Sequence, residues 1–163
     1  MKLVLDCGLA LRPAEASDLP YVAECIRESL TASVTDAEAK LADLWSDTTV
    51  AVAVDSLSSR RMGDEAFILT DGTENRGMLW MGASRDQYTA EETGYLLGIY
   101  VSKDLRGKGI GRELITAAES WCLDKGLYTM QLDVSPFNEP AYSLYGLSGY
   151  TVRSAVMTKT LKR

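Results

Sequence analysis

Histidine is absent from this sequence and cysteine is scarce, and these two shortages exclude several kinds of site. The three cysteines, Cys7, Cys25 and Cys122, are odd in number, widely spaced and without a CxxC pair. Because no histidine can complete a mixed ligand set, we expect no zinc or other metal site, and we expect no structural disulfide. Unpaired cysteines fit a reducing compartment, so we expect a cytoplasmic protein.

Long apolar runs and basic clusters are also missing. No window approaches the length of a membrane-spanning helix, and Asp6 interrupts the apolar stretch that a secretory signal at the amino terminus would need. The formal net charge is −6, and no basic run rises above the short tail of Lys159, Lys162 and Arg163. We therefore expect neither a membrane nor a nucleic acid as partner. An acidic surface favours a cationic substrate.

The remaining composition is that of an ordinary globular protein. The chain has 163 residues, of which 46% are hydrophobic and 25% are charged. This length allows one hydrophobic core and is short for two domains, so we expect a single domain over residues 1–163. A homodimer is possible, and the sequence does not decide it.

Hydrophobic periodicity divides the chain into strands and helices. Ser17-Asp18 offers an N-cap to the first helix, and Gly126 offers a C-cap to a later one. Residues 48–54 fit either an extended segment or a prolongation of the preceding helix, and the polar residues 56–65 are predicted to form a loop. Strands are expected at residues 9–12, 66–70, 78–83, 95–101, 128–134, 151–153 and 156–161, and helices after Asp18, from Thr35, at 110–126 and at 138–147.

The order of these elements predicts the fold class. Short turns such as Asp71-Gly72 join the middle strands, which indicates an antiparallel meander. The strand, helix and strand within residues 95–134 predict a right-handed crossover and a parallel pair in the centre of the sheet. We expect an α/β (α+β) protein with a mixed, largely antiparallel sheet of about seven strands and helices on both faces.

The strongest local signal is the segment RGKGIG at residues 106–111, directly between a predicted strand and a predicted helix. Glycines there let the backbone approach a ligand, and the N–H groups of a first helical turn form an anion site that suits a pyrophosphate. The spacing fits neither GxxxxGK followed by Ser or Thr nor GxGxxG, so ATP and NAD are not supported. A turn that only caps the helix is the structural alternative.

The longer segment YLLGIYVSKDLRGKGIGRELI resembles the acetyl-coenzyme A signature of GNAT acetyltransferases. That signature reads Gln or Arg, two residues, Gly, one residue, then Gly or Ala, and Arg106, Gly109 and Gly111 match it. The resemblance implies acetyl-CoA as the acetyl donor. It implies that main-chain N–H groups of residues 107–112 bind the pyrophosphate, and that the main chain of residues 99–101 pairs with the pantetheine arm like an added strand.

A second segment, NEPAYSLY at residues 138–145, is followed by Gly149-Tyr150 and resembles the second signature of the family. Asn138 fits locally as an N-cap, and the resemblance adds a coenzyme contact. The residues implied to bind the cofactor are Ile99, Tyr100, Val101, Arg106, Gly107, Lys108, Gly109, Ile110, Gly111, Arg112 and Asn138, with Lys108 and Arg112 adding charge to phosphate contacts.

The same resemblance implies that Tyr145 is the general acid that protonates the departing thiolate. Tyr142 is a nearby alternative, and a half-buried core tyrosine is the purely structural interpretation of Tyr145.

A base must accept a proton from the attacking amine, and the chain has no histidine for this task. Asp133 is the first candidate, because ribosomal-protein N-terminal acetyltransferases, a branch of the family, often carry a catalytic Glu at this place. Tyr95, Glu91 and Glu92 are the alternatives. Cys122 lies on an apolar helical stripe, so we expect direct transfer in a ternary complex rather than a covalent cysteine intermediate.

The resemblance covers most of the chain, least well between Trp45 and Glu65. It implies a GNAT-like fold whose sheet splits where Val101 and Val134 diverge to admit the cofactor. It also implies an N-acetyltransferase that moves acetyl from acetyl-CoA to a primary amine. The acceptor stays open among a protein N-terminus, a lysine, a polyamine, an amino acid and an antibiotic. The alternative from another class is a regulatory module that binds coenzyme A without turnover.

Overall fold

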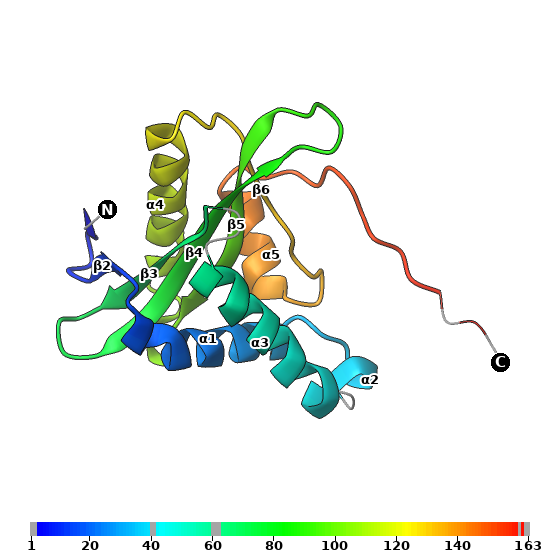
Figure 1. Ribbon diagram of the computed structural model, residues 1–163, viewed down its shortest axis with the longest axis horizontal. Coiled ribbons are helices and arrows are strands. Elements are labelled where there is room, and N and C mark those ends of the chain that lie inside the picture. The colour runs from blue at the N-terminus through cyan, green and yellow to red at the C-terminus, as the bar shows by residue number, and fades with distance from the viewer. Residues whose placement is uncertain (1–2, 40–41, 60–62, 160, 162–163) are drawn as a thin grey trace.

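The computed structural model describes residues 3–39, 42–59, 63–159 and 161. Its strands form one sheet in the order β1-β2-β3-β4-β5-β6, in which only β5 and β6 are parallel (Figure 1). The elements are β1 (Leu3–Val4), β2 (Ala10–Pro13), α1 (Leu19–Thr31), α2 (Asp36–Ala39), α3 (Ala42–Ser59), β3 (Glu65–Thr70), β4 (Asn75–Arg85), β5 (Glu92–Val101), α4 (Ile110–Asp124), β6 (Met130–Leu132) and α5 (Glu139–Leu147).

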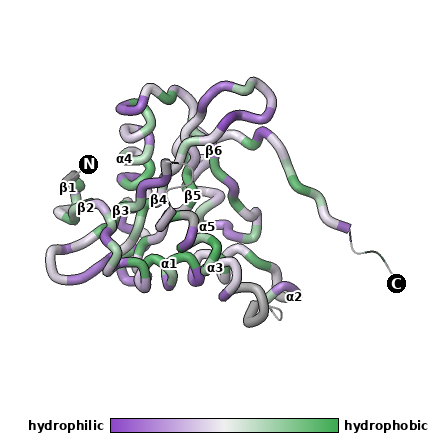
Figure 2. Tube along the Cα trace, viewed as in Figure 1, coloured by the Kyte–Doolittle hydropathy of each residue, from purple (hydrophilic) through white to green (hydrophobic). Residues whose placement is uncertain are grey.

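The sheet separates two hydrophobic clusters, one on each face. Because side chains alternate along a strand, Phe67 and Leu69 of β3 face one cluster while Ile68 faces the other. Helices α4 and α5 cover the first face, for example through Leu114, and α1 and α3 cover the second, for example through Val22. Figure 2 shows hydrophobic residues recurring along α1 and along α4. The expected helices on both faces are confirmed.

The carboxy-terminal end of α4 is capped at Gly126, as predicted. The N–H of Leu127 donates to Cys122 O at 2.9 Å, and the N–H of Gly126 donates to Leu123 O at 3.0 Å. These two bonds define the Schellman motif, which satisfies the last carbonyl groups of a helix. The chain then turns directly toward β6.

The number of strands differs from the prediction. The described sheet has six strands, of which β1 has only two residues, and not about seven. Residues 151–159 and 161 form no strand and are exposed. They run outward from the body of the protein instead of returning to the sheet (Figure 1). As a result, the parallel pair of β5 and β6 lies at an edge of the described sheet and not in its centre.

The region between α1 and β3 also corrects the prediction. Residues 48–54 are helical, and α3 continues to Ser59, so the loop predicted from residue 56 is wrong over its first four positions. Four residues at helical spacing pack into the cluster that α1 contributes to, namely Val50, Ala53, Val54 and Leu57. This packing selects the helix. Residues 60–62, and residues 40–41 between α2 and α3, lie outside the described part of the chain.

No helix within the described residues is both long enough and apolar enough to cross a membrane.

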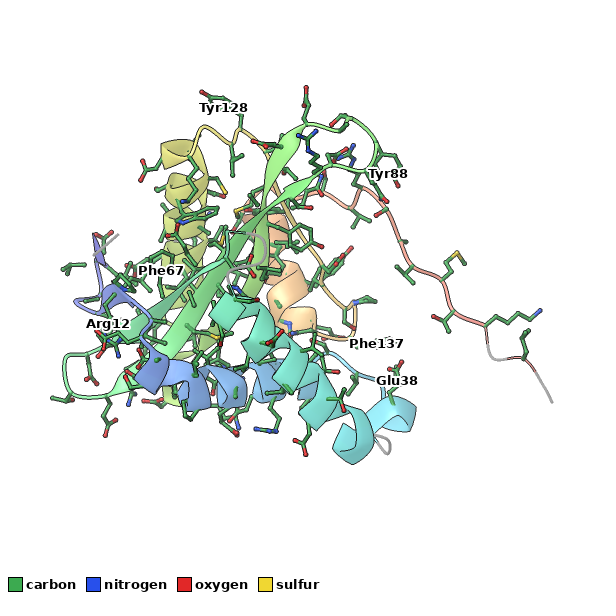
Figure 3. The ribbon with its side chains drawn as sticks, in the orientation of Figure 1. Arg12, Glu38, Phe67, Tyr88, Tyr128 and Phe137 are labelled. Atoms are coloured by element: carbon green, nitrogen blue, oxygen red, sulfur yellow. The ribbon has the colours of Figure 1, made fainter. Side chains whose placement is uncertain are left out.

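A partly buried ion pair joins the start of α1 to the sheet. Arg12 donates two hydrogen bonds to Asp18, at 2.6 and 2.8 Å, and Asp18 also accepts from the N–H of Glu15 at 2.9 Å and from Asn75 at 3.3 Å. Asp18 is only 5% exposed, and Figure 3 labels Arg12 at this junction. The Arg12 guanidinium holds the pKa of Asp18 at about 2.

We predict that Asp18→Asn destabilises the protein by about 2 kcal/mol at pH 7, because it removes a charge-assisted bidentate contact. The pKa of Asp18 in the folded state, about 2, lies below its ordinary value of 3.8. The stabilisation is therefore complete above about pH 4 and is lost as the pH falls through 2. Urea unfolding at several pH values measures this. Asp47→Asn, at a side chain that is 79% exposed, is the control and should change little. Equal stability of the two variants at pH 7 would contradict the prediction.

Candidate active site

β5 and β6 lie side by side only along the first part of β5. They share three residue pairs, Gly94 with Met130, Tyr95 with Gln131 and Leu96 with Leu132. β6 then ends, whereas β5 continues to Val101. In the described part of the chain, residues 97–101 therefore have no strand beside them on this edge. The two strands therefore part directly after Leu96 and Leu132, earlier along both strands than the expected divergence at Val101 and Val134.

The opening begins at an extra residue in β5. Leu97 has no partner on β4, because consecutive β4 residues pair with Gly98 and Leu96. A residue inserted in this way is a β-bulge, which bends its strand and increases the local twist. β5 therefore changes course just after its last pair with β6, between Leu96 and Leu132.

The loop after β5 leaves main-chain N–H groups without helical acceptors. The backbone at Gly107 and Gly109 has φ of +74° and +82°, angles that glycine adopts without strain, and a Cβ at either position would meet nothing within 4 Å. The first helical bonds that the structure describes here run from the N–H groups of Arg112 and Glu113 to Gly109 O, at 2.9 and 3.2 Å. The N–H groups of residues 107–111 precede them, as in the first turn of any helix.

Arg106 lies against the end of β5. Its Nε donates to Val101 O at 3.0 Å, and its guanidinium carbon is 5.5 Å from the centroid of the Tyr100 ring. The first residue of the signature thus ties the loop to the open strand edge. This contact joins two of the segments that were predicted to bind the cofactor.

Lys108 and Arg112 differ in their surroundings. Lys108 is exposed and has no polar partner among the described residues. Arg112 reaches Leu147 O at the end of α5, at 3.5 Å, and its N–H is already bonded to Gly109 O. The N–H groups without a helical acceptor are therefore those of residues 107–111, and the role of residues 107–112 in pyrophosphate binding stays a prediction.

Glu28 on α1 also lies beside the end of β5, and the sequence patterns did not predict it. Its carboxylate accepts from the Tyr100 hydroxyl at 3.0 Å and pairs with Lys103 at 3.1 Å. Lys103, followed by Tyr100, holds the pKa of Glu28 below its ordinary value. No local pattern could have found the contact, since 72 residues separate Glu28 from Tyr100.

Tyr145 is positioned by the cap of its own helix. The N–H of Tyr150 donates to Tyr145 O at 3.1 Å, and the N–H of Gly149 donates to Gly146 O at 3.1 Å. Gly149 has φ of +91°, which this Schellman motif requires. The rings of Tyr145 and Tyr150 meet edge to face, with centroids 5.9 Å apart. The Gly149-Tyr150 pair of the second signature therefore ends α5 at a fixed place and packs a second ring against the Tyr145 ring.

The Tyr145 side chain lies in a buried, apolar setting. The residue is 7% exposed and belongs to the cluster against which Ile99, Val101 and Leu132 pack, at the diverging ends of β5 and β6. Burial raises the pKa of Tyr145 to about 12, so the phenol stays protonated at neutral pH. Within the described residues no group hydrogen-bonds to this hydroxyl. Tyr142, the alternative, is 42% exposed.

Asn138 caps α5 and joins it to α1. Its side chain accepts from the N–H of Ala141 at 3.4 Å, and its Nδ2 donates to Ser33 Oγ at 3.5 Å. The local N-cap role expected for Asn138 is confirmed.

This arrangement agrees with a family comparison. Residues 31–150 match the model of the acetyltransferase (GNAT) family. The chain belongs to this family. A curated relative, streptothricin acetyltransferase from Escherichia coli, is 39% identical over 54 residues, which is 33% of this chain and 31% of that protein.

Solved acetyltransferase structures share the fold over nearly the whole chain. A GCN5-related N-acetyltransferase from Ralstonia eutropha JMP134 has a TM-score of 0.73 at 19% identity, covering 94% of this chain and 99% of that one. AAC(6')-Iy in complex with the bisubstrate analogue CoA-S-monomethyl-acetylneamine has a TM-score of 0.68 at 17% identity, covering 95% and 99%. Aminoglycoside 6'-N-acetyltransferase AAC(6')-IG from Acinetobacter haemolyticus has 0.65 at 17%, covering 94% and 98%. At these identities the likeness concerns the fold alone.

Two of the candidate bases of this GNAT chain touch each other. The Tyr95 hydroxyl donates to Asp133 Oδ2 at 2.6 Å. Their neighbours Leu96 and Leu132 face the α4 side, so strand alternation places Tyr95 and Asp133 on the opposite face of the sheet. Burial, and after it the hydrogen bond to Asp133, raises the pKa of Tyr95 to about 12. The pair lies where β5 and β6 part.

The remaining candidates lie apart from this pair. Glu91 and Glu92 are exposed at the beginning of β5, where Glu92 is opposite Arg85 of β4. Cys122 is 3% exposed, and burial raises the pKa of its thiol to about 11. Such a thiol is a poor nucleophile at neutral pH, which agrees with the expectation of direct transfer. Among the described residues no group of His, Cys, Asp and Glu could hold a metal ion.

We predict that Asp133→Asn lowers the pKa of the Tyr95 phenol by about 1, because the substitution removes a negative charge that opposes the phenolate. Burial should still keep this pKa above its ordinary value of 10. NMR of tyrosine labelled with carbon-13 at Cζ, with Tyr95→Phe to assign the signal, measures the titration. Asp47→Asn is the control, and an unchanged Tyr95 titration in Asp133→Asn would show that the pair does not form in solution.

Proposed function

We propose that this GNAT protein is an N-acetyltransferase that moves an acetyl group from acetyl-CoA to a primary amine of a small cationic molecule. One observation carries the proposal: the open main-chain edge of residues 97–101 leads directly into a loop with free N–H groups at residues 107–111. A strand-like arm ending in a pyrophosphate is the ligand that suits such a continuous site.

The described residues fit the coenzyme. Glycines at 107 and 109 leave open space where side chains would otherwise stand, and the N–H groups of the first turn of α4 suit an anion. In this proposal residues 99–101 hold the pantetheine arm and residues 107–111 hold the pyrophosphate, with Lys108 free to contact phosphate. When bound, the cofactor supplies the acetyl thioester.

Tyr145 is proposed as the general acid. Its side chain is buried in the cluster against which the end of β5 packs, and its hydroxyl is protonated at neutral pH. A thiolate that leaves in an apolar setting needs a proton, and Tyr145 would donate it to the sulfur. The lack of a hydrogen-bond partner among the described residues leaves the hydroxyl available for this donation.

Asp133 is proposed as the general base, with Tyr95 as its positioning residue. Tyr95 donates to one carboxylate oxygen and leaves the other, Oδ1, to accept the proton that the amine loses. In this proposal Asp133 would take one proton from the amine and Tyr145 would give one proton to the departing sulfur, which balances the formation of an amide and a thiol.

The acceptor class is proposed from charge and from the relatives. A net charge of −6 favours a cationic amine over a neutral one. The partial match to streptothricin acetyltransferase supports an amine-bearing antibiotic as the first acceptor to test. A ribosomal-protein N-terminus is the competing acceptor, because Asp133 stands where that branch of the family often carries a catalytic Glu.

Tyr145→Phe tests the proposed mechanism. We predict that this substitution lowers kcat by about 100-fold or more with little change in acetyl-CoA affinity, because it removes the proton donor and keeps the ring. Release of the thiol, with streptothricin, an aminoglycoside and an amino-terminal ribosomal peptide as acceptors, measures the rate. Calorimetry with acetyl-CoA, and with ATP for comparison, measures the affinity.

Tyr142→Phe is the matched control, because it makes the same change one helical turn earlier at an exposed tyrosine, and it should leave kcat unchanged. Full turnover by Tyr145→Phe would remove the acid role from Tyr145. Tight binding of acetyl-CoA without turnover on any acceptor would favour a coenzyme-binding module, and failure to bind acetyl-CoA would refute the proposed function itself.

A further inference from the structure

Two carboxylates flank the turn at residues 102–106, which links β5 to the loop proposed for the pyrophosphate. Asp104 lies within this turn, and Glu28 of α1 contacts both Tyr100, before the turn, and Lys103, inside it. A carboxylate near a bound polyanion repels it. Two carboxylates at this place would weaken coenzyme binding unless they serve another purpose.

The main chain of the 102–106 turn has a defined shape. Residues Lys103–Leu105 form a short 3-10 helix, in which the N–H of Leu105 donates to Ser102 O at 2.9 Å. The N–H of Ser102 donates to Arg76 O of β4, also at 2.9 Å. The Leu105 side chain packs against the core cluster on the α4 side of the sheet. The turn is therefore closed and tied to the sheet before the first glycine of the loop.

The charged side chains of the turn are held by three different elements. Lys103 pairs with Glu28 of α1 at 3.1 Å. Asp104 accepts a hydrogen bond from Arg76 of β4. Arg106 donates to the main chain at the end of β5. The turn is thus fixed from α1, from β4 and from β5 directly before the N–H groups proposed for the pyrophosphate.

Arg76 is itself restricted by the hairpin between β3 and β4. Its side chain is 20% exposed, and it also pairs with Glu74 at 3.1 Å and with Asp71 at 3.9 Å. An arginine held by other partners loses less conformational freedom when it binds one more carboxylate. Asp104 therefore meets a partner that is already in place.

Glu28 also reaches the turn through Tyr100. Its carboxylate accepts from the Tyr100 hydroxyl at 3.0 Å, and the guanidinium carbon of Arg106 lies 5.5 Å from the centroid of the Tyr100 ring. A cation near an aromatic ring is attracted to the electron density of the ring. The Tyr100 ring is thus fixed between a carboxylate of α1 and a cation of the turn.

We propose that Glu28 and Asp104 are positioning residues of the coenzyme site, an inference that rests on the proposed function. Acting through Lys103, Tyr100 and Arg76, they hold the 102–106 turn in the coenzyme-free protein. The N–H groups of the following loop then stand in their binding geometry before the pyrophosphate arrives. A loop fixed in its bound conformation binds more tightly, because less conformational freedom is lost on binding.

The sign of the effect of removing these charges tests the positioning role. Asp104→Asn and Glu28→Gln each remove a negative charge beside an anion site, so electrostatics alone would tighten coenzyme binding. We expect the opposite: each substitution should raise the Kd of coenzyme A about 3-fold, and both together about 10-fold, because the turn is released. Calorimetry measures the Kd. Glu24→Gln makes the same change one helical turn earlier on α1, at an exposed side chain, and as the matched control should leave the Kd unchanged.

Acetylpantetheine as donor separates positioning from a general loss of structure. It carries the thioester and the pantetheine arm but no pyrophosphate, so it does not use the positioned loop. The variant with both substitutions should lower kcat/KM about 10-fold for acetyl-CoA and leave kcat/KM for acetylpantetheine unchanged. Unchanged or tighter coenzyme binding by this variant would overturn the proposal, as would an equal loss with the two donors. Failure of the unsubstituted protein to bind coenzyme A would instead refute the proposed function, on which the inference rests.

Discussion

β5 contains one inserted residue, Leu97, that has no pairing partner on β4. The direction of β5 beyond Leu97 follows from this insertion. An inserted residue bends a strand, and the bend comes directly after the last pair between β5 and β6. The main chain of residues 97–101 is thereby left open on one edge. The proposed cofactor site, the position of the Tyr95 and Asp133 pair, and the approach to Tyr145 all depend on this opening.

The two faces of the sheet divide the proposed chemistry between them. On the α4 and α5 side, close helix packing brings Tyr145 into the core. A Cβ at Gly111 would lie 3.0 Å from Leu144, so the last glycine of the signature lets the two helices approach. On the other side, Tyr95 and Asp133 meet in a partly solvated setting. A buried acid and an exposed base placed on opposite faces suit a transfer that passes through the gap between the strands.

Much of this could be predicted from local sequence, and the failures share one cause. The turn at Asp71 and the caps of α4 and α5 are local chemistry, and they came out as expected. Residues 48–54 fit two patterns equally, and packing of α3 against α1, which joins distant parts of the chain, selected the helix. Residues 151–161 have strand propensity, but a strand also needs a neighbouring strand, and the described residues of this segment have none. Likewise, the contact between Tyr95 and Asp133 depends on strand register across 38 residues.

Hydrogen exchange of single main-chain amides, followed by NMR with and without acetyl-CoA, tests the central claim most directly. If the open edge and the loop together form the cofactor site, exchange should slow at those N–H groups of residues 97–101 that face away from β4 and at residues 107–111. Residues 67–69 of β3, which are already paired on both sides, should not change. Unchanged exchange at both 97–101 and 107–111 in the presence of saturating acetyl-CoA would contradict the account.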